Sequence, residues 1–283
     1  ENDEVKIEIN IEAKGIRRGS CIIFLQKNIK ALNVHWHIDK KPVNDPESVF
    51  FAFPINLENY KFNLDLNGIN SEPNKDQLKG SSKDWYPFHR YVNVSDGSKG
   101  ITMASLDAPL LNLGGITSGK WTGAGDLEPE GPHLYSWAIN NHWMVNFKSS
   151  QEGKIPFRFR FQTHSHDFDI PSSFQFGLDS LSPPIILRDK KRKSEKIQET
   201  FISCDSKFIN FTLKPSEDSK AIILRAQNLT TKECFCTFST TFKIKNINIT
   251  NILENLISEI KNNNNEFKLS FIGNEIKTLK IIL

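Results

Sequence analysis

The sequence lacks both a long hydrophobic run and a strong excess of charge of either sign. The longest apolar stretches, such as Val49–Phe53, are far shorter than the roughly 20 residues that a membrane-spanning helix needs. The 36 lysines and arginines nearly balance the 33 aspartates and glutamates, which leaves a formal net charge of +3. Because this charge is small, we expect neither a nucleic-acid partner nor a membrane partner.

Cysteine is also scarce, with 4 in 283 residues. Cys234 and Cys236 are two residues apart, so on a strand they share one face and are poorly placed to pair with each other. The acidic N-terminus has no hydrophobic core of a signal peptide. Together these features favour a reduced, cytoplasmic setting. Asn-x-Ser/Thr sequons occur as well, but in a chain so rich in asparagine we attribute them to chance.

Alternation of apolar and polar residues dominates the chain. It is plain in EVKIEINIEA (4–13), KFNLDL (61–66) and IPFRFRFQTH (155–164), and several later segments repeat it. In the last of these, Phe157, Phe159 and Phe161 share one face while Arg158 and Arg160 share the other. A period of two is typical of half-buried strands. The pattern predicts an all-β protein: a large (super)sandwich of antiparallel strands followed by a smaller β-sandwich.

A boundary is expected near DSLSPPIILRDKKRKSEKIQET (179–200). Pro183 and Pro184 disfavour regular structure, and residues 190–193 are all basic. A basic run can bind anions or nucleic acid, but acidic residues follow it and no aromatic residues interleave, which favours a solvated linker. We therefore predict a large domain over residues 1–188 and a smaller one over 189–283.

Motifs for catalysis are weak. GGITSGK (114–120) nearly matches a phosphate-binding loop, but Trp121 replaces the magnesium-binding hydroxyl and no helical pattern follows. The pairs His35/His37 and His164/His166 have a spacing found in zinc sites, yet the pairs would have to meet in space. We expect no metal ligands and no catalytic residues in this chain, and from the residues alone its status as an enzyme stays open.

Aromatic and polar side chains concentrate between residues 76 and 169. Aromatic faces that stack on sugar rings, beside amides and carboxylates that bond hydroxyls, are how proteins hold carbohydrates, although large aromatics more often fill a core. In HLYSWAINNHWMVNF (133–147), a long strand is expected with Tyr135, Trp137, Ile139 and Asn141 on one face. If Asn141 is buried there, its amide needs hydrogen-bond partners.

Five blocks resemble the C-terminal β-rich region of glycoside hydrolase family 38, the α-mannosidases. They occur in the family's order: ESVFFAFPINL, SEPNKDQLKGSSKDWYPFHRYVNVSD, GITMASLDAPLLNLGG, HLYSWAINNHWMVNFKSSQEG and FRFRFQTHSHDFD. The ending NILENLISEI…NEIKTLKIIL is similar to the end of those chains. The resemblance runs from about Glu47 to Leu283.

The resemblance implies a non-catalytic portion of an α-mannosidase-like enzyme. In the family, the catalytic residues and the zinc lie in an N-terminal barrel that nothing here matches, so the implied partners are that barrel and a mannose-containing carbohydrate, with no cofactor in this chain. The β-region of the family lends residues to the rim of the sugar site. The candidates, taken from the two most family-like blocks, are Asp107, Asn141, His142 and Trp143.

The resemblance also bears on NILENLISEI (251–260). Ile252, Leu253, Leu256 and Ile257 have helical spacing, but the family's corresponding stretch is extended, so we expect extended or irregular structure there. Two further hypotheses about function remain. One is an independent carbohydrate-binding module, and the other is a structural sandwich that binds a protein partner through an apolar patch.

Overall fold

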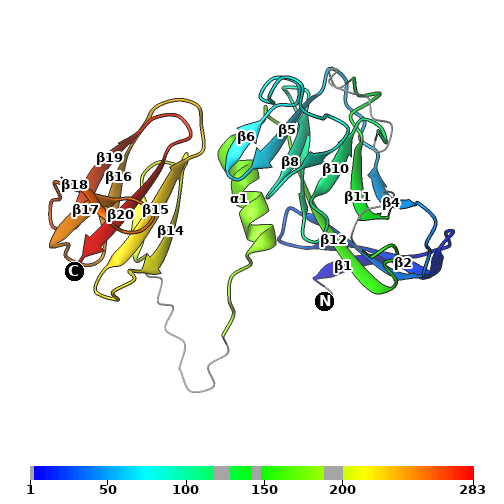
Figure 1. Cartoon of the computed structure of the whole chain (residues 1–283), viewed down its shortest axis with the longest axis horizontal. Helices are drawn as coiled ribbons and strands as arrows, with labels where there is room; N and C mark the ends of the chain where they lie inside the picture. Colours follow the sequence, from blue (N-terminus) through cyan, green and yellow to red (C-terminus); the bar gives the residue numbers. More distant parts are fainter. Residues whose placement is uncertain (1–2, 118–127, 142–147, 188–199) are drawn as a thin grey trace. The chain divides into compact units, whose positions relative to one another are not determined.

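The computed structural model describes residues 3–117, 128–141, 148–187 and 200–283. The chain divides into two compact units, Glu1–Pro184 and Ile185–Leu283, coloured from blue to green and from yellow to red in Figure 1. The boundary predicted between residues 188 and 189 falls in a segment outside the described residues. Both units are built from antiparallel sheets, so the predicted fold class, a large sandwich followed by a smaller one, is confirmed.

An eight-stranded antiparallel sheet forms most of the first unit, in the order β1-β2-β3-β12-β9-β8-β5-β6. Its strands are β1 (Glu4–Ile11), β2 (Ile16–Gln26), β3 (Leu32–Lys40), β5 (Lys61–Leu66), β6 (Ile69–Ser71), β8 (Val92–Ser95), β9 (Gly100–Ser105) and β12 (Gly153–His164). The central strand β12 buries Phe157, Phe159 and Phe161, as the alternation predicted. The arginines between them point to the opposite, polar face of the sheet.

A four-stranded sheet, in the order β4-β11-β10-β7, supplies the other layer of this unit. It contains β4 (Ser48–Phe53), β7 (Tyr86–Pro87), β10 (Leu110–Leu113) and β11 (Leu134–Asn140). Phe51 and Phe53 of β4 meet the phenylalanines of β12 at ring-centroid distances of 4.9–5.7 Å. These edge-on and tilted ring contacts join the two sheets into one core.

Strand β11 ends at Asn140 within the strand predicted across residues 133–147, of which residues 142–147 lie outside the described residues. A register shift between Trp137 and Ile139 also breaks the alternation on which the prediction relied. As a result, Leu134 and Ile139 belong to the main core. Trp137 lies on the other face of β11, stacked on Phe50 at 5.7 Å. A β-bulge adds one residue and so exchanges the two faces of a strand, which a strict period of two does not anticipate.

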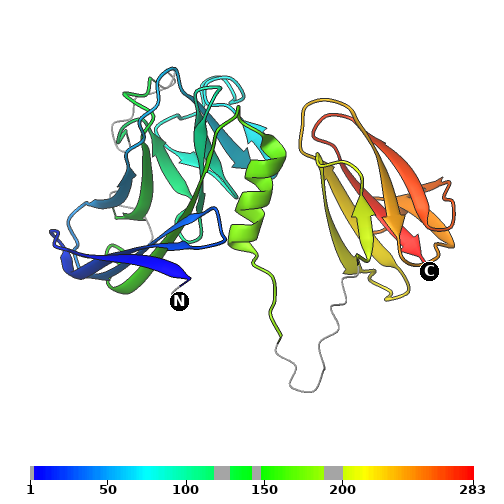
Figure 2. The same cartoon turned by 180° about the vertical axis from the view of Figure 1, so that it is seen from behind.

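The alternation also gives no sign of the single helix in the described residues, α1 (Ile170–Leu181). Asp169 caps it, and its carboxylate accepts from the Ser172 N–H. Gly177 lets the helix approach the backbone of Arg90 closely, since a Cβ at position 177 would lie 2.6 Å from the Arg90 carbonyl oxygen. Figures 1 and 2 show α1 alongside the β5, β6 and β8 end of the sheet. With 12 residues, it is too short to cross a membrane, and no described helix is longer.

The second unit is a sandwich of a three-stranded sheet (β13-β16-β19) and a five-stranded sheet (β14-β15-β20-β17-β18). The strands are β13 (Ile202–Cys204), β14 (Ile209–Pro215), β15 (Ile222–Asn228), β16 (Cys234–Thr240), β17 (Asn246–Thr250), β18 (Leu256–Ile260), β19 (Glu266–Phe271) and β20 (Ile276–Ile282). Phe238, Phe271 and Leu279 are fully buried between the two sheets. The unit therefore has a core of its own.

The segment 251–260 is a turn followed by strand β18, which confirms the extended prediction over the helical one. Asn251 stabilises the turn, since its side-chain oxygen accepts from the Leu253 and Asn255 amides. Leu256 and Ile257 of β18 are exposed. The helical spacing of its apolar residues is thus unrelated to burial, because this strand lies at the edge of its sheet.

Candidate functional site

Asp107 lies in the turn between β9 and β10 and is clamped by Arg158 of β12. Its carboxylate accepts from the Arg158 backbone N–H at 2.8 Å and from Nε and Nη2 of the same side chain at 2.9 and 2.8 Å. Partial burial alone would raise the pKa of Asp107, but the hydrogen bonds and charge of Arg158 outweigh it, so the pKa is lowered. Asp107 is therefore an ionised, oriented group on the surface.

His35 of β3 stands opposite Arg158 in the register, on the same polar face of the sheet. Its ring meets the edge of Phe24 at 4.9 Å. Burial lowers the pKa of His35, and the electrostatic effects of Arg158 and His37 lower it further, against a smaller opposing effect of Asp107. The imidazole is thereby held neutral near pH 7 and offers one donor and one acceptor nitrogen.

A groove of about 670 Å³ continues this polar face across the ends of β1, β2, β3 and β12. Cross-strand register places the side chains in rows: Asn10, Ser20 and His37 in one, and Arg18, Asp39 and Lys154 in the next. Asp39 bonds Arg17 at 2.9 Å. Arg18, Lys154 and Asn10 make no side-chain hydrogen bond or ion pair within the described parts of the chain. The groove thus offers uncommitted donors and acceptors to a polar ligand.

Asn141, a predicted rim residue, bonds backbone groups of two loops. Its Oδ1 accepts from the Glu47 N–H at 2.7 Å. Its Nδ2 lies 2.9, 3.1 and 2.8 Å from the carbonyl oxygens of Val43, Asp45 and Ser149. These contacts satisfy the amide at the end of β11 and join two loops that are about a hundred residues apart. The other two predicted rim residues, His142 and Trp143, lie outside the described residues.

The described aromatic residues of segment 76–169 mostly fill the core. Trp137 and Tyr86 are 3% and 5% exposed, and Trp85 meets Trp137 edge-on at 5.8 Å. His133 Nδ1 accepts from the Ile55 N–H at 3.1 Å. An exposed aromatic platform for sugar is therefore not formed by these side chains. Trp121 lies outside the described residues.

Arg90 has a structural role in the same segment. Its guanidinium bonds the buried carboxylate of Asp65 at 3.1 Å and lies 4.5 Å from the Phe174 ring centroid on α1. Asp65 also accepts from the Arg90 and Gly68 amides. Such charge-assisted bonds compensate for burial of the two charges and fix the helix to the sheet.

The two histidine pairs do not meet. His35 and His37 lie at the centre of β3, whereas His164 ends β12, and its Nε2 lies 2.8 Å from the Asn93 amide nitrogen. Among the residues that the structure describes, no group of three or more histidine, cysteine, aspartate or glutamate side chains could hold a metal ion. The described donor set therefore does not fit a zinc centre.

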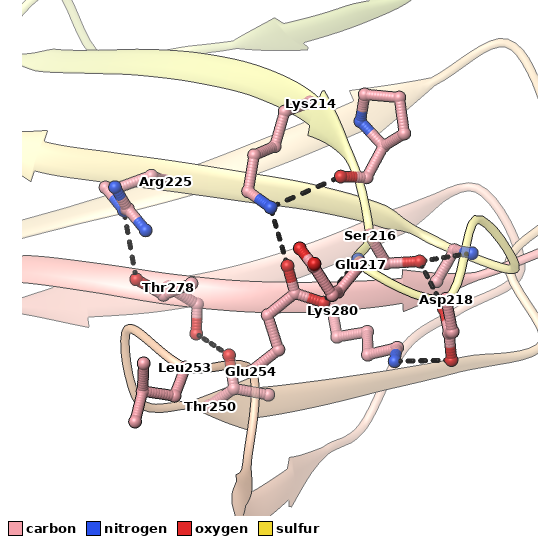
Figure 3. A network of polar contacts seen from close by, with 12 residues as sticks. Lys214, Ser216, Glu217, Asp218, Arg225, Thr250, Leu253, Glu254, Thr278 and Lys280 are labelled. Carbon is pink, nitrogen blue, oxygen red and sulfur yellow. Dashed lines mark hydrogen bonds and ion pairs between the residues drawn. The ribbon is translucent and has the colours of Figure 1, made fainter.

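A polar network covers one end of the second unit and joins two hairpin turns (Figure 3). Glu254, between β17 and β18, bonds Lys214 Nζ at 2.6 Å and accepts from the Glu217 N–H at 2.9 Å. Asp218 bonds Lys280 Nζ at 2.9 Å. Hydrogen bonds from Ser216 and Lys280 lower the pKa of Asp218. Because each lysine here is paired with a carboxylate, we assign the network a structural role in holding the two turns together.

The sequence did not predict that Arg158, His35 and the groove lie on one surface. Arg158 and Asp107 are 51 positions apart, and only the pairing of β12 with both β3 and β9 brings the three side chains together. The alternation in 155–164 did place Arg158 on a polar face. Nothing local in the sequence specifies which strands neighbour it.

Residues 208–279 match the family model of the glycosyl hydrolases family 38 C-terminal beta sandwich domain. No curated protein sequence matches the chain. The matched residues run from the start of β14 into β20, so the similarity to this domain lies within the second unit. The resemblance noted in the sequence is confirmed there.

Two solved structures from Enterococcus faecalis share the fold of nearly the whole chain. One is described as a protein in the glycosyl hydrolase family 38, with a TM-score of 0.67, 15% identity, and coverage of 93% of this chain and 29% of that one. The other is an alpha-mannosidase, with a TM-score of 0.69, 13% identity, and coverage of 98% and 33%. The chain thus spans about a third of the length of either structure.

Proposed function

We propose that this chain is the C-terminal, non-catalytic β-sandwich portion of an α-mannosidase-like glycoside hydrolase. The observation that carries the proposal is the match of residues 208–279 to the C-terminal β-sandwich domain of family 38. The shared fold of both units with longer family 38 structures supports it. In this role the chain packs on a catalytic barrel and contributes polar groups to the rim of a mannose-binding site.

The rim of this proposal consists of Asp107, Asn141, His142 and Trp143. Asp107 would bond sugar hydroxyls, because Arg158 keeps its carboxylate ionised and oriented. Asn141 would act indirectly, by holding the backbone just before His142, since its own amide is already bonded. Zinc would belong to the barrel, and the chain would need no cofactor of its own. A reduced, cytoplasmic setting is part of the proposal.

A second candidate function is an independent carbohydrate-binding module. The groove on the polar face favours it, because Asn10, Arg18 and Lys154 are uncommitted there. Uncommitted amides and cations are suited to bonding sugar hydroxyls. Unlike the rim, the groove would bind saccharide without a catalytic barrel.

Titration of the purified chain with mannose and oligomannosides, followed by calorimetry, separates the two functions. The rim proposal predicts no measurable binding by the isolated chain, since its site is completed by the barrel. Millimolar or tighter binding, weakened by Arg18→Gln combined with Lys154→Gln and unchanged by Lys79→Gln on an exposed loop, would establish the module instead.

A further inference from the structure

Three of the four cysteines lie together at one edge of the second unit. Strand β13 pairs with β16 so that Cys204 stands opposite Phe238. Continuing that antiparallel register places Ser206 opposite Cys236, with Cys234 two residues further along the same face. Side chains of Cys204, Ser206, Cys234 and Cys236 therefore form a ladder along the inner face of the three-stranded sheet.

Diagonal neighbours in this ladder lie close together. Ser206 Oγ lies 3.2 Å from Cys234 Sγ. Cys204 and Cys236 have the same diagonal offset on the same face of the two strands. A second thiol is therefore a neighbour of the Cys204 sulfur.

The two sulfurs differ in environment. Hydrogen bonds from Cys236 and Ser206 outweigh burial and lower the pKa of Cys204 to about 7. The pKa of Cys236 is raised by its hydrogen bond to Cys204 and by its burial. Cys204 is half-buried, whereas Cys236 is 4% exposed. A thiolate that solvent can reach, next to a protonated thiol, is the arrangement of an attacking and a resolving cysteine.

We propose that Cys204 and Cys236 form an oxidisable dithiol, which hydrogen peroxide converts to a disulfide across strands β13 and β16. The Cys204 thiolate attacks the peroxide, so that an S–O bond forms, the O–O bond breaks and hydroxide leaves. The Cys236 sulfur then attacks the sulfenic sulfur, which forms the S–S bond and expels the oxygen as water. Two electrons pass from the two sulfurs to the peroxide.

The edge position of β13 allows the bond to close. This strand has three residues and is bonded to β16 alone. Because β13 belongs to the three-stranded sheet alone, it can shift toward Cys236 without disturbing the five-stranded sheet. Cys234 is a poorer partner for Cys204, since it lies one pleat further away and contacts the Ser206 hydroxyl.

The test is to treat the whole reduced chain with hydrogen peroxide at neutral pH and to map its disulfides by mass spectrometry. The expected product has lost two hydrogen masses, contains a Cys204–Cys236 linked peptide, and regains its starting mass with dithiothreitol. Cys204→Ser should abolish the product, whereas Cys234→Ser and Cys21→Ser should retain it. Mapping of the unmodified sequence needs no variant, so a misfolded variant does not obscure the result.

A dominant linkage involving Cys234 or Cys21 would overturn the proposal. Oxidation of Cys204 to sulfinic acid without any disulfide would overturn it too, because the resolving step would then be absent. The alkylation rate of Cys204 provides an independent check. Its half-maximal value should lie near pH 7 and shift upward in Cys236→Ala, which removes the side-chain donor.

Discussion

Asn141 and Asp107 show how residues of similar polarity acquire different roles from their surroundings. Asn141 bonds four backbone groups and leaves no amide hydrogen for a ligand. Asp107 has a single partner residue, Arg158, and remains exposed. Both stood out in the sequence as polar residues in family-like blocks. Ser149 is eight positions from Asn141, but the other partners are 51 to 98 positions away and were not visible there.

Replacing Asn141 with aspartate should destabilise the first unit. The substitution preserves the shape and the acceptor for Glu47, but it turns the Nδ2 donor into an oxygen that faces three carbonyl groups. We expect a loss of about 2–3 kcal/mol in the free energy of unfolding, measured by urea denaturation. Asn44→Asp makes the same chemical change on an exposed loop and should stay within about 0.5 kcal/mol. Equal effects of the two variants would contradict the anchoring role.

The ion pair of Asp107 predicts a pH-dependent contribution to stability. Because the folded-state pKa of Asp107 is lowered, its stabilisation is fully present above the unfolded value of about 3.9 and is lost as the pH falls through the folded value. Asp107→Asn should therefore be less stable than the natural sequence at pH 6. The difference should shrink as the pH is lowered below about 4.

Thermal unfolding at pH 6 and again below about pH 4 measures the difference in stability between Asp107→Asn and the natural sequence. Asp45→Asn, at an exposed position without a described ion pair, is the matched control and should stay within about 0.5 kcal/mol. A difference between Asp107→Asn and the natural sequence that persists unchanged at the lowest pH would show that the carboxylate charge is not what stabilises the pair.

Secondary-structure elements were predicted well where alternation is regular and poorly where it is interrupted. Residues 155–164 gave β12 with the correct buried face. The bulge in β11 reverses which residues face the core after Trp137. No residue type in that strand predicts an extra residue. In α1, the Asp169 cap and Pro171 were present as signals. Pro171 and several serines also suit a loop, so the helix depends on its packing against the sheet.

Close packing of α1 against Arg90 predicts that Gly177→Ala destabilises the protein, which is the opposite of its usual effect in a helix. Within a helix this change ordinarily stabilises by up to about 1 kcal/mol. Here the new methyl group would lie 2.6 Å from the Arg90 carbonyl oxygen and 2.7 Å from its Cβ. We expect a net destabilisation of about 1–2 kcal/mol in urea unfolding, because overpacking outweighs helix propensity. Gln175→Ala, on the exposed face, is the control, and a stabilising Gly177→Ala would refute the close contact.

At the scale of the whole molecule, each unit has its own apolar core. Fully buried Phe159 lies in the first and fully buried Phe238 in the second. The order of a large sandwich and a smaller one followed from the alternation and from the proline-rich and basic stretch between them. The pairing of strands into four sheets did not, since register and sheet order depend on contacts between distant segments.

Because the cores are separate, replacing a core side chain of one unit with alanine should change the thermal unfolding of that unit alone. Phe238→Ala should destabilise the second unit by about 3–5 kcal/mol and lower its thermal transition, leaving that of the first unit in place. Phe159→Ala should do the reverse. Differential scanning calorimetry of both variants beside the natural sequence resolves the two transitions. A single transition that both variants lower equally would show that the chain unfolds as one cooperative body.

The proposed function is that this chain supports catalysis performed by another part of an α-mannosidase-like enzyme. The most direct measurement is the hydrolysis of an aryl α-mannoside by the purified chain, with and without added zinc. We expect no release of the aryl group above the buffer blank in either condition, because the proposed function places the catalytic residues and the zinc in a barrel outside this chain. Clear, zinc-dependent turnover that copurifies with the chain would contradict it.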